Sequence, residues 1–179
     1  MASSNKTTHL RLNQWSSNDP VLRTDFNADN SRVDLAVHQR ALLRLASGSL
    51  SGKQATISIP LEADFSQYRQ LQLVCAPVVA DGTYAGSFTG PTVQLSVNNG
   101  TKANLMRISE DAAAAQGFEV HLFLTPNGLA GFNLGGSSVT AVSGLGNANL
   151  GASATLRLSL TDSAQFGAGC WYAVYGLQK

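Results

Sequence analysis

Few side chains in this chain combine the residue type and the spacing that metal binding requires. The three histidines, His9, His38 and His121, form no pair at metal-ligand spacing, and we interpret them as separate surface or half-buried side chains. Oxygen-bearing side chains alternate in residues 25–30, as they do in a calcium loop. The sixth position lacks the required glycine and the twelfth is Ala36 instead of glutamate, so helix capping explains these residues better. We therefore predict no metal site.

The acidic and hydroxyl side chains form no catalytic motif. No serine lies in a G-x-S-x-G sequence, and the glycine-rich loops lack the G-K-S/T ending of a phosphate-binding loop. Glu62 with Asp64, and Glu110 with Asp111, would support glycoside cleavage only if the fold brought suitable carboxyl groups about 5–9 Å apart. Solvated turn and capping acids are the simpler interpretation. We expect neither catalysis nor a cofactor.

The two cysteines, Cys75 and Cys170, lie far apart in the sequence, and neither belongs to a C-x-x-C pair that would indicate zinc. The first residues are polar and lack the apolar centre of a signal peptide. Disulfides belong mainly to exported proteins, so we predict buried free thiols.

Aromatic side chains are the remaining candidates for ligand recognition. Tyr84 and Phe88 lie in a glycine-rich loop at residues 81–90, where burying their rings would be difficult, and Phe132 lies in a second glycine-rich stretch. Amphipathic rings suit stacking on sugars, so we predict these three residues as the receptor-binding candidates. Trp171 belongs to an apolar C-terminal run and is expected to lie in the core.

The composition excludes several classes of partner. Charged residues make up only 13% of the chain and the net charge is +1, without a basic run, so we expect no nucleic-acid binding. No segment approaches the roughly 20 consecutive apolar residues of a membrane-spanning helix, so we expect no membrane insertion. Abundant glycine, serine, threonine and asparagine suit short strands and many turns.

Residues 25–48 carry the spacing of one helix, which we expect to run to about residue 46, with Thr24 or Asp25 as its cap and Gly48 as its stop. Such a helix must bury its apolar stripe. The stripe can pack on the chain's own β-domain or on copies of itself about a threefold axis. For the second case, the candidate interface residues are Val33, Val37, Ala41 and Leu45.

From residue 49 to 179 the apolar pattern changes to a period of two, which indicates strands. Alternating or continuously apolar runs occupy residues 56–59, 71–77, 92–97, 103–108, 118–124, 139–142, 154–160 and 170–175. A capping serine and first-turn acids predict a short helical segment at residues 109–116, and residues 128–151 read mainly as long loops. We predict a mainly β chain: an antiparallel, jelly-roll-like β-sandwich preceded by one N-terminal α-helix.

Residues 6–34 join a short apolar and polar stretch with Leu10, Leu12 and Trp15 to a polar turn and then to the sequence Thr-Asp-Phe-Asn. This arrangement resembles the N-terminal attachment segment of tail-fibre and receptor-binding proteins from tailed phages and prophages of Gram-positive bacteria. The resemblance implies that residues 1–24 attach to other tail or baseplate proteins, with Leu10, Leu12 and Trp15 as the attachment candidates. It also implies a homotrimer that is made in the bacterial cytoplasm and resides in the tail of the virion.

We therefore expect a phage or phage-derived tail or baseplate component, a receptor-binding protein or short tail fibre that binds a host-surface glycan. The sequence lacks the collagen-like or long coiled-coil shaft of many fibres, which favours a short, compact component. The alternative is a capsid decoration or head-fibre structural protein. A small glycan depolymerase is a third reading that the acidic residues favour less.

Overall fold

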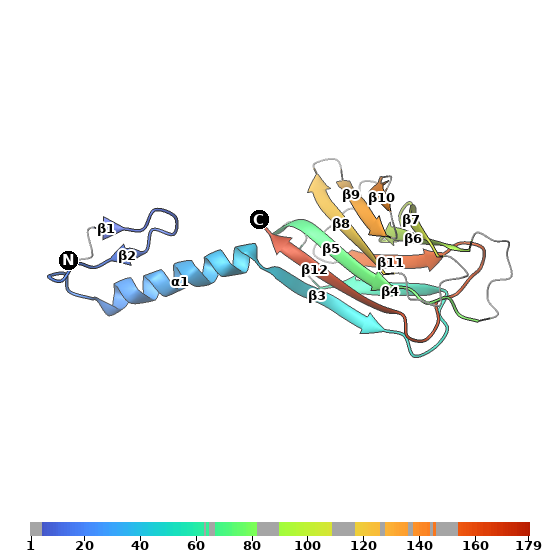
Figure 1. Cartoon of the computed structure of the whole chain (residues 1–179), viewed down its shortest axis with the longest axis horizontal. Coiled ribbons are helices and arrows are strands. Elements are labelled where there is room, and N and C mark those ends of the chain that lie inside the picture. Colours follow the sequence, from blue (N-terminus) through green and yellow to red (C-terminus); the bar gives the residue numbers. More distant parts are fainter. Residues whose placement is uncertain are drawn as a thin grey trace. The chain divides into compact units, whose positions relative to one another are not determined.

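The structure is a computed structural model that describes residues 5–62, 64, 67–81, 90–108, 117–125, 128–135, 138–143, 145 and 154–179. The chain forms two compact units, one that ends at Ala41 and one that begins at Leu42 (Figure 1). The predicted short helix at residues 109–116 lies outside the described residues.

The N-terminal unit consists of a two-stranded antiparallel sheet, β1 (Asn5–Lys6) and β2 (Asn13–Gln14), and the helix α1 (Arg23–Arg40). The predicted cap is wrong, because the residue that precedes the helix is Leu22 and no side chain caps the first turn. Asp25 lies instead inside the first turn, where its negative charge complements the helix dipole.

The helix ends earlier than its apolar spacing predicts. The backbone N–H of Ala41 donates to the carbonyl of Val37 at 2.9 Å, and residues after it are extended. Leu42–Ser49 forms strand β3, which pairs with the C-terminal strand. The predicted helix to residue 46 or 48 is therefore wrong, and Leu45 belongs to β3 and packs against the core of the second unit. Pairing with a neighbouring strand here outweighs the local helical spacing.

The second unit is an antiparallel β-sandwich, so the predicted fold class is confirmed. One sheet has six strands in the order β10-β9-β8-β5-β12-β3, and the other has four in the order β4-β11-β6-β7. The chain passes between the sheets several times, as it does in a jelly roll. The strands are β3 (Leu42–Ser49), β4 (Thr56–Leu61), β5 (Tyr68–Ala76), β6 (Thr92–Val97), β7 (Ala103–Arg107), β8 (Phe118–Thr125), β9 (Gly128–Gly135), β10 (Ser138–Val142), β11 (Ala154–Leu160) and β12 (Trp171–Gln178).

The glycine-rich stretch predicted as loops contains two of these strands. β9 pairs with β8, and β10 pairs with β9, so this part of the chain extends the six-stranded sheet at one edge. A strand at residues 139–142 was expected, whereas β9 was not. Glycine is unusual in strand interiors, but it allows close approach of neighbouring backbone. A Cβ added at Gly131 would collide with the carbonyl oxygen of His121 on β8.

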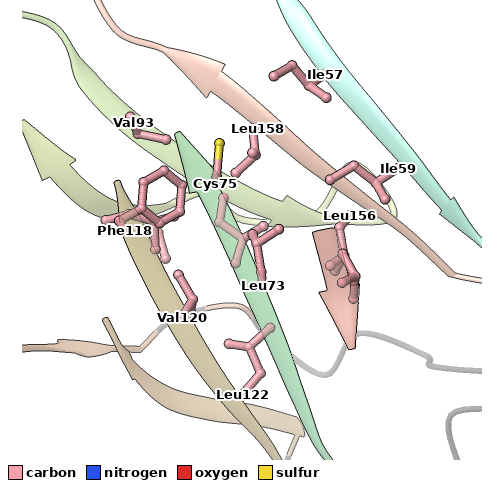
Figure 2. Packing of buried hydrophobic residues seen from close by; sticks show 14 of the residues in the cluster. Ile57, Ile59, Leu73, Cys75, Val93, Phe118, Val120, Leu122, Leu156 and Leu158 are labelled. Carbon is pink, nitrogen blue, oxygen red and sulfur yellow. The ribbon is translucent and has the colours of Figure 1, made fainter. Parts of the chain in front are cut away.

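The core lies between the two sheets and is built from alternate residues of the strands (Figure 2). Leu73 on β5 and Val120 on β8 face Leu156 and Leu158 on β11, and all four side chains are fully buried. Cys75 lies in the same cluster. The alternation in the sequence thus reports which face of each strand turns inward.

The two cysteines are free and buried, as predicted. The thiol of Cys75 donates a hydrogen bond to the sulfur of Cys170. This bond and burial raise the pKa of the Cys75 thiol, whereas accepting the bond lowers the pKa of Cys170. Both side chains have 0% exposure. We expect a thiol reagent such as dithionitrobenzoate to modify neither cysteine in the native protein and both in denaturant. Rapid modification of either one in the folded chain would contradict this packing.

Candidate functional site

Six polar and aromatic side chains gather on the outer face of the six-stranded sheet. The inward residues of β8 are Phe118, Val120 and Leu122, so its intervening residues turn away from the core. Cross-strand pairing aligns Gln72 with His121 and His121 with Phe132, which brings side chains from three strands together. We name this group the outer-face cluster; its members are Gln70, Gln72, Glu119, His121, Phe123 and Phe132.

The aromatic part of the outer-face cluster is a small stacked platform. The ring of Phe132 stacks on the imidazole of His121, with centroids 4.8 Å apart and an interplanar angle of 16°. Phe123 lies 5.9 Å from Phe132 at a tilt of 35°, and it is 38% exposed. Phe123 thereby presents a wide apolar surface to solvent at the edge of the stack.

Hydrogen-bonding groups border this platform. The side-chain amide of Gln72 donates to Oε1 of Glu119 at 2.5 Å, and the same oxygen contacts Nε2 of His121. The amide nitrogen of Gln70 lies 2.6 Å from Nδ1 of His121. An amide nitrogen can only donate, so Nδ1 accepts and Nε2 carries the proton that faces Glu119. The network fixes the imidazole ring in the orientation that stacks on Phe132.

Gly131 allows the close strand pairing that positions Phe132 beside His121. Gly131 lies opposite Leu122 in the register of β8 and β9, where an added Cβ would meet the β8 backbone. The missing side chain lets β9 approach closely, and the next residue, Phe132, then stands directly beside His121.

The sequence identified one member of the outer-face cluster, Phe132. Tyr84 and Phe88, the other receptor-binding candidates, lie outside the described residues. His121 is half-buried, as predicted, but its contact with Glu119 and its stacking on Phe132 were not predicted. The alternation of this strand predicts that Glu119, His121 and Phe123 share its outward face, but it does not distinguish them from ordinary surface residues.

Two further expectations concern residues outside the cluster. Trp171 was expected in the core, but it is 44% exposed as the first residue of β12. Glu62 and Asp64 are both exposed and do not join the outer-face cluster. Among the described residues, no group of three or more histidine, cysteine, aspartate or glutamate side chains could hold a metal ion.

In the N-terminal unit, the carboxylate of Asp29 connects α1 to the β1–β2 sheet through hydrogen bonds. Asp29 of α1 is 7% exposed, and its two oxygens accept hydrogen bonds from the backbone and the side-chain amide of Asn13, at 2.8 and 2.9 Å. Arg32 also donates to Asp29 at 3.0 Å, and Lys6 reaches the other side of Asn13. Burial alone would raise the pKa of Asp29, but the hydrogen bonds from Asn13 and the nearby cations outweigh it and hold the pKa below its usual value.

We expect Asp29→Ala to loosen the β1–β2 sheet from α1, because both Asn13 donors would lose their acceptor. Backbone hydrogen exchange at Asn13 should accelerate and the fluorescence of Trp15 should change, while the β-sandwich melts as before. The same loosening should appear in the wild type as the pH falls through the depressed pKa of Asp29, below its ordinary value of 3.8, since a lowered native pKa stabilises the charged form. Asp34→Ala, an exposed acid on the same helix, is the control and should leave exchange unchanged.

The attachment candidates belong to this unit as well. Leu10, Leu12 and Trp15 are half-buried, and the indole N–H of Trp15 is buried with no acceptor among the described residues. On α1, an apolar stripe stands exposed: Phe26 at 53%, Val33 at 39% and Val37 at 63%. Val33 and Val37 were predicted for a trimer interface; Ala41 lies at the helix end, and Leu45 is not on the helix.

No protein-family model matches the chain, and no curated protein matches it. The resemblance of the N-terminal segment to phage attachment segments therefore stays a prediction from the sequence. None of the helices in the described part of the chain is long and apolar enough to span a bilayer.

Proposed function

We propose that this chain is a phage or phage-derived tail or baseplate component, a receptor-binding protein or short tail fibre, and that its β-sandwich binds a host-surface glycan. The observation that carries the proposal is the outer-face cluster, in which the stacked rings of His121 and Phe132 lie beside two side-chain amides and a carboxylate. Phe132, predicted from the sequence as a receptor contact, is one of those rings.

The chemistry of sugars suits this arrangement. A pyranose ring has an apolar face of C–H groups, which stacks on aromatic rings such as Phe123 and Phe132. Its hydroxyl groups need donors and acceptors at the rim of the platform, and Gln70, Gln72 and Glu119 supply both kinds. Because these side chains already bond to one another, they are held in place before a ligand arrives, which lowers the entropy cost of binding.

The N-terminal unit would perform assembly. The stripe of Phe26, Val33 and Val37 lies on one side of α1 and is exposed, so packing against copies of itself would remove its apolar surface from water. We assign to this stripe the homotrimer implied by the resemblance. Leu10, Leu12 and the indole N–H of Trp15 would contact another tail or baseplate protein, and that contact would place the chain in the tail of the virion.

A structural role is the second candidate, and the same exposed stripe favours it. A capsid decoration or head-fibre protein needs self-association and an attachment segment, both of which the N-terminal unit offers, but it needs no ligand site. Such a protein should bind expanded capsids and ignore cells.

A binding assay on whole bacteria separates these functions. Fluorescently labelled protein is mixed with a panel of Gram-positive strains before and after periodate treatment, which cleaves vicinal diols in surface sugars. A receptor-binding protein should label at least one strain and lose most of that label after periodate. Binding that survives periodate would rule out a glycan receptor of that kind, and binding to capsids alone would assign the structural role.

A further inference from the structure

A second polar site lies on the other sheet of the sandwich. On the outer face of the four-stranded sheet, a pocket of about 170 Å³ opens near the ends of β6 and β11. That volume exceeds the space of several water molecules, at about 30 Å³ each. Its lining includes two cations, Arg157 and Lys102, and three hydroxyl side chains, Thr56, Ser96 and Ser159. Within the part of the chain that the structure describes, it contains no acidic residue.

Strand register places the guanidinium among hydroxyl groups. Arg157 on β11 lies opposite Ser96 on β6 and Ser58 on β4, and Ser159 lies opposite Thr56. Ser96 is only 6% exposed although it stands on the outer face of its strand. Hydroxyl groups can donate to an anion from both flanks of Arg157.

Arg157 lines this pocket and has an unpaired donor. Its Nε atom is buried and has no hydrogen-bond partner among the described residues. Buried polar groups are nearly always paired, because an unpaired donor loses the hydrogen bonds that water would give it. An anion bound to the terminal guanidinium nitrogens would lie next to this N–H, and a shift of the Arg157 side chain would let it accept from Nε as well.

The turn that carries Lys102 is fixed to the strand of Arg157. Asn98 and Asn99 both have positive φ values, 49° and 60°, and the N–H of Gly100 donates to the carbonyl of Val97 at 2.8 Å. Asparagine tolerates this left-handed conformation well, and the geometry is that of a tight hairpin turn. The side chain and backbone of Asn98 also bond to Thr155, at 2.8 and 3.0 Å, two residues before Arg157.

From this geometry we infer that the pocket binds an oxyanion, a phosphate or carboxylate group, through Arg157, Lys102 and the flanking hydroxyls. Guanidinium pairs with planar or tetrahedral oxyanions through parallel hydrogen bonds, and lysine adds a point charge at the rim. The site is separate from the outer-face cluster and requires neither a glycan receptor nor a trimer. The group could be a phosphodiester or a sugar carboxylate, which share this chemistry.

The test uses the whole protein and three small probes: glycerol phosphate, glucuronate and the neutral sugar glucose. At low salt, the Arg157 Nε–H resonance should shift saturably with at least one anionic probe and stay still with glucose. The anion that binds more tightly identifies the source. Arg157→Gln and Lys102→Gln should each weaken binding about tenfold or more, since each removes a charged donor.

Arg107→Gln is the matched control, because it removes an equal charge from the same sheet outside the pocket and should leave the affinity unchanged. Lys102 is exposed, so its replacement tests the site even if the Arg157 variant folds poorly. No saturable shift with either anion, or an equal loss in the Arg107 variant, would overturn the proposal.

Discussion

Aspartate at both Val33 and Val37 should convert a homotrimer into monomers. The two valines lie four residues apart on α1 and, with Phe26 seven residues before Val33, form one exposed apolar stripe. Burial of such a surface contributes about 25 cal/mol per Å² of apolar area, and six aspartates around a threefold axis would replace that gain with charge repulsion. Light scattering should then give a mass near 18.8 kDa, whereas we expect three times that value for the wild type.

Leu35→Asp is the control for this experiment. Leu35 is 54% exposed on the same helix, but it lies about 200° around the helix axis from Val33. It should keep the trimer, because a helix in a bundle buries only one stripe. Wild-type protein that stays monomeric at micromolar concentration would exclude self-association. A double variant that remains trimeric would move the interface to the β-sandwich.

The apolar alternation predicts much of the sandwich, but it misses two strands, β3 and β9, for different reasons. In β3, Leu42, Leu43 and Leu45 satisfy helical spacing as well as the spacing of an edge strand. Only pairing with β12 decides between them, and that partner lies more than a hundred residues away along the chain. In β9, Leu129 is a buried apolar residue, but the next two inward positions are Gly131 and the buried Asn133, so the strand shows little alternation.

The outer-face cluster shows a further limit of sequence reasoning. Phe132 could be selected because an aromatic ring among glycines suggests an exposed face. Glu119 and His121 carry no signal of that kind, since polar side chains on alternate positions of a strand are ordinary surface residues. They become a site only when the register of β5, β8 and β9 sets Gln72 and Phe132 beside them. Register depends on the whole sheet, so composition and spacing cannot supply it.

Phe132→Ala should reduce binding to glycan-bearing cells about tenfold or more. The substitution removes the ring that stacks on His121 and faces Phe123, and aromatic stacking contributes about 0.5–1.5 kcal/mol beyond the area it buries, to which the lost contact area adds. Phe132 is half-buried and lies outside the core, so the free energy of unfolding should fall by about 1 kcal/mol at most. Cell binding and thermal melting are measured on the same preparation.

Two companion variants make the result specific to the platform. Phe132→Leu keeps an apolar side chain on β9 but loses the flat ring, so it should bind nearly as poorly as the alanine variant. Trp171→Ala removes an exposed aromatic side chain from the same sheet, outside the outer-face cluster, and should bind normally. If the alanine variant binds cells fully while remaining folded, the outer-face cluster is not the receptor site. If it instead loses its trimer, the rings form a contact between copies of the chain, because a lost ligand contact would leave assembly intact.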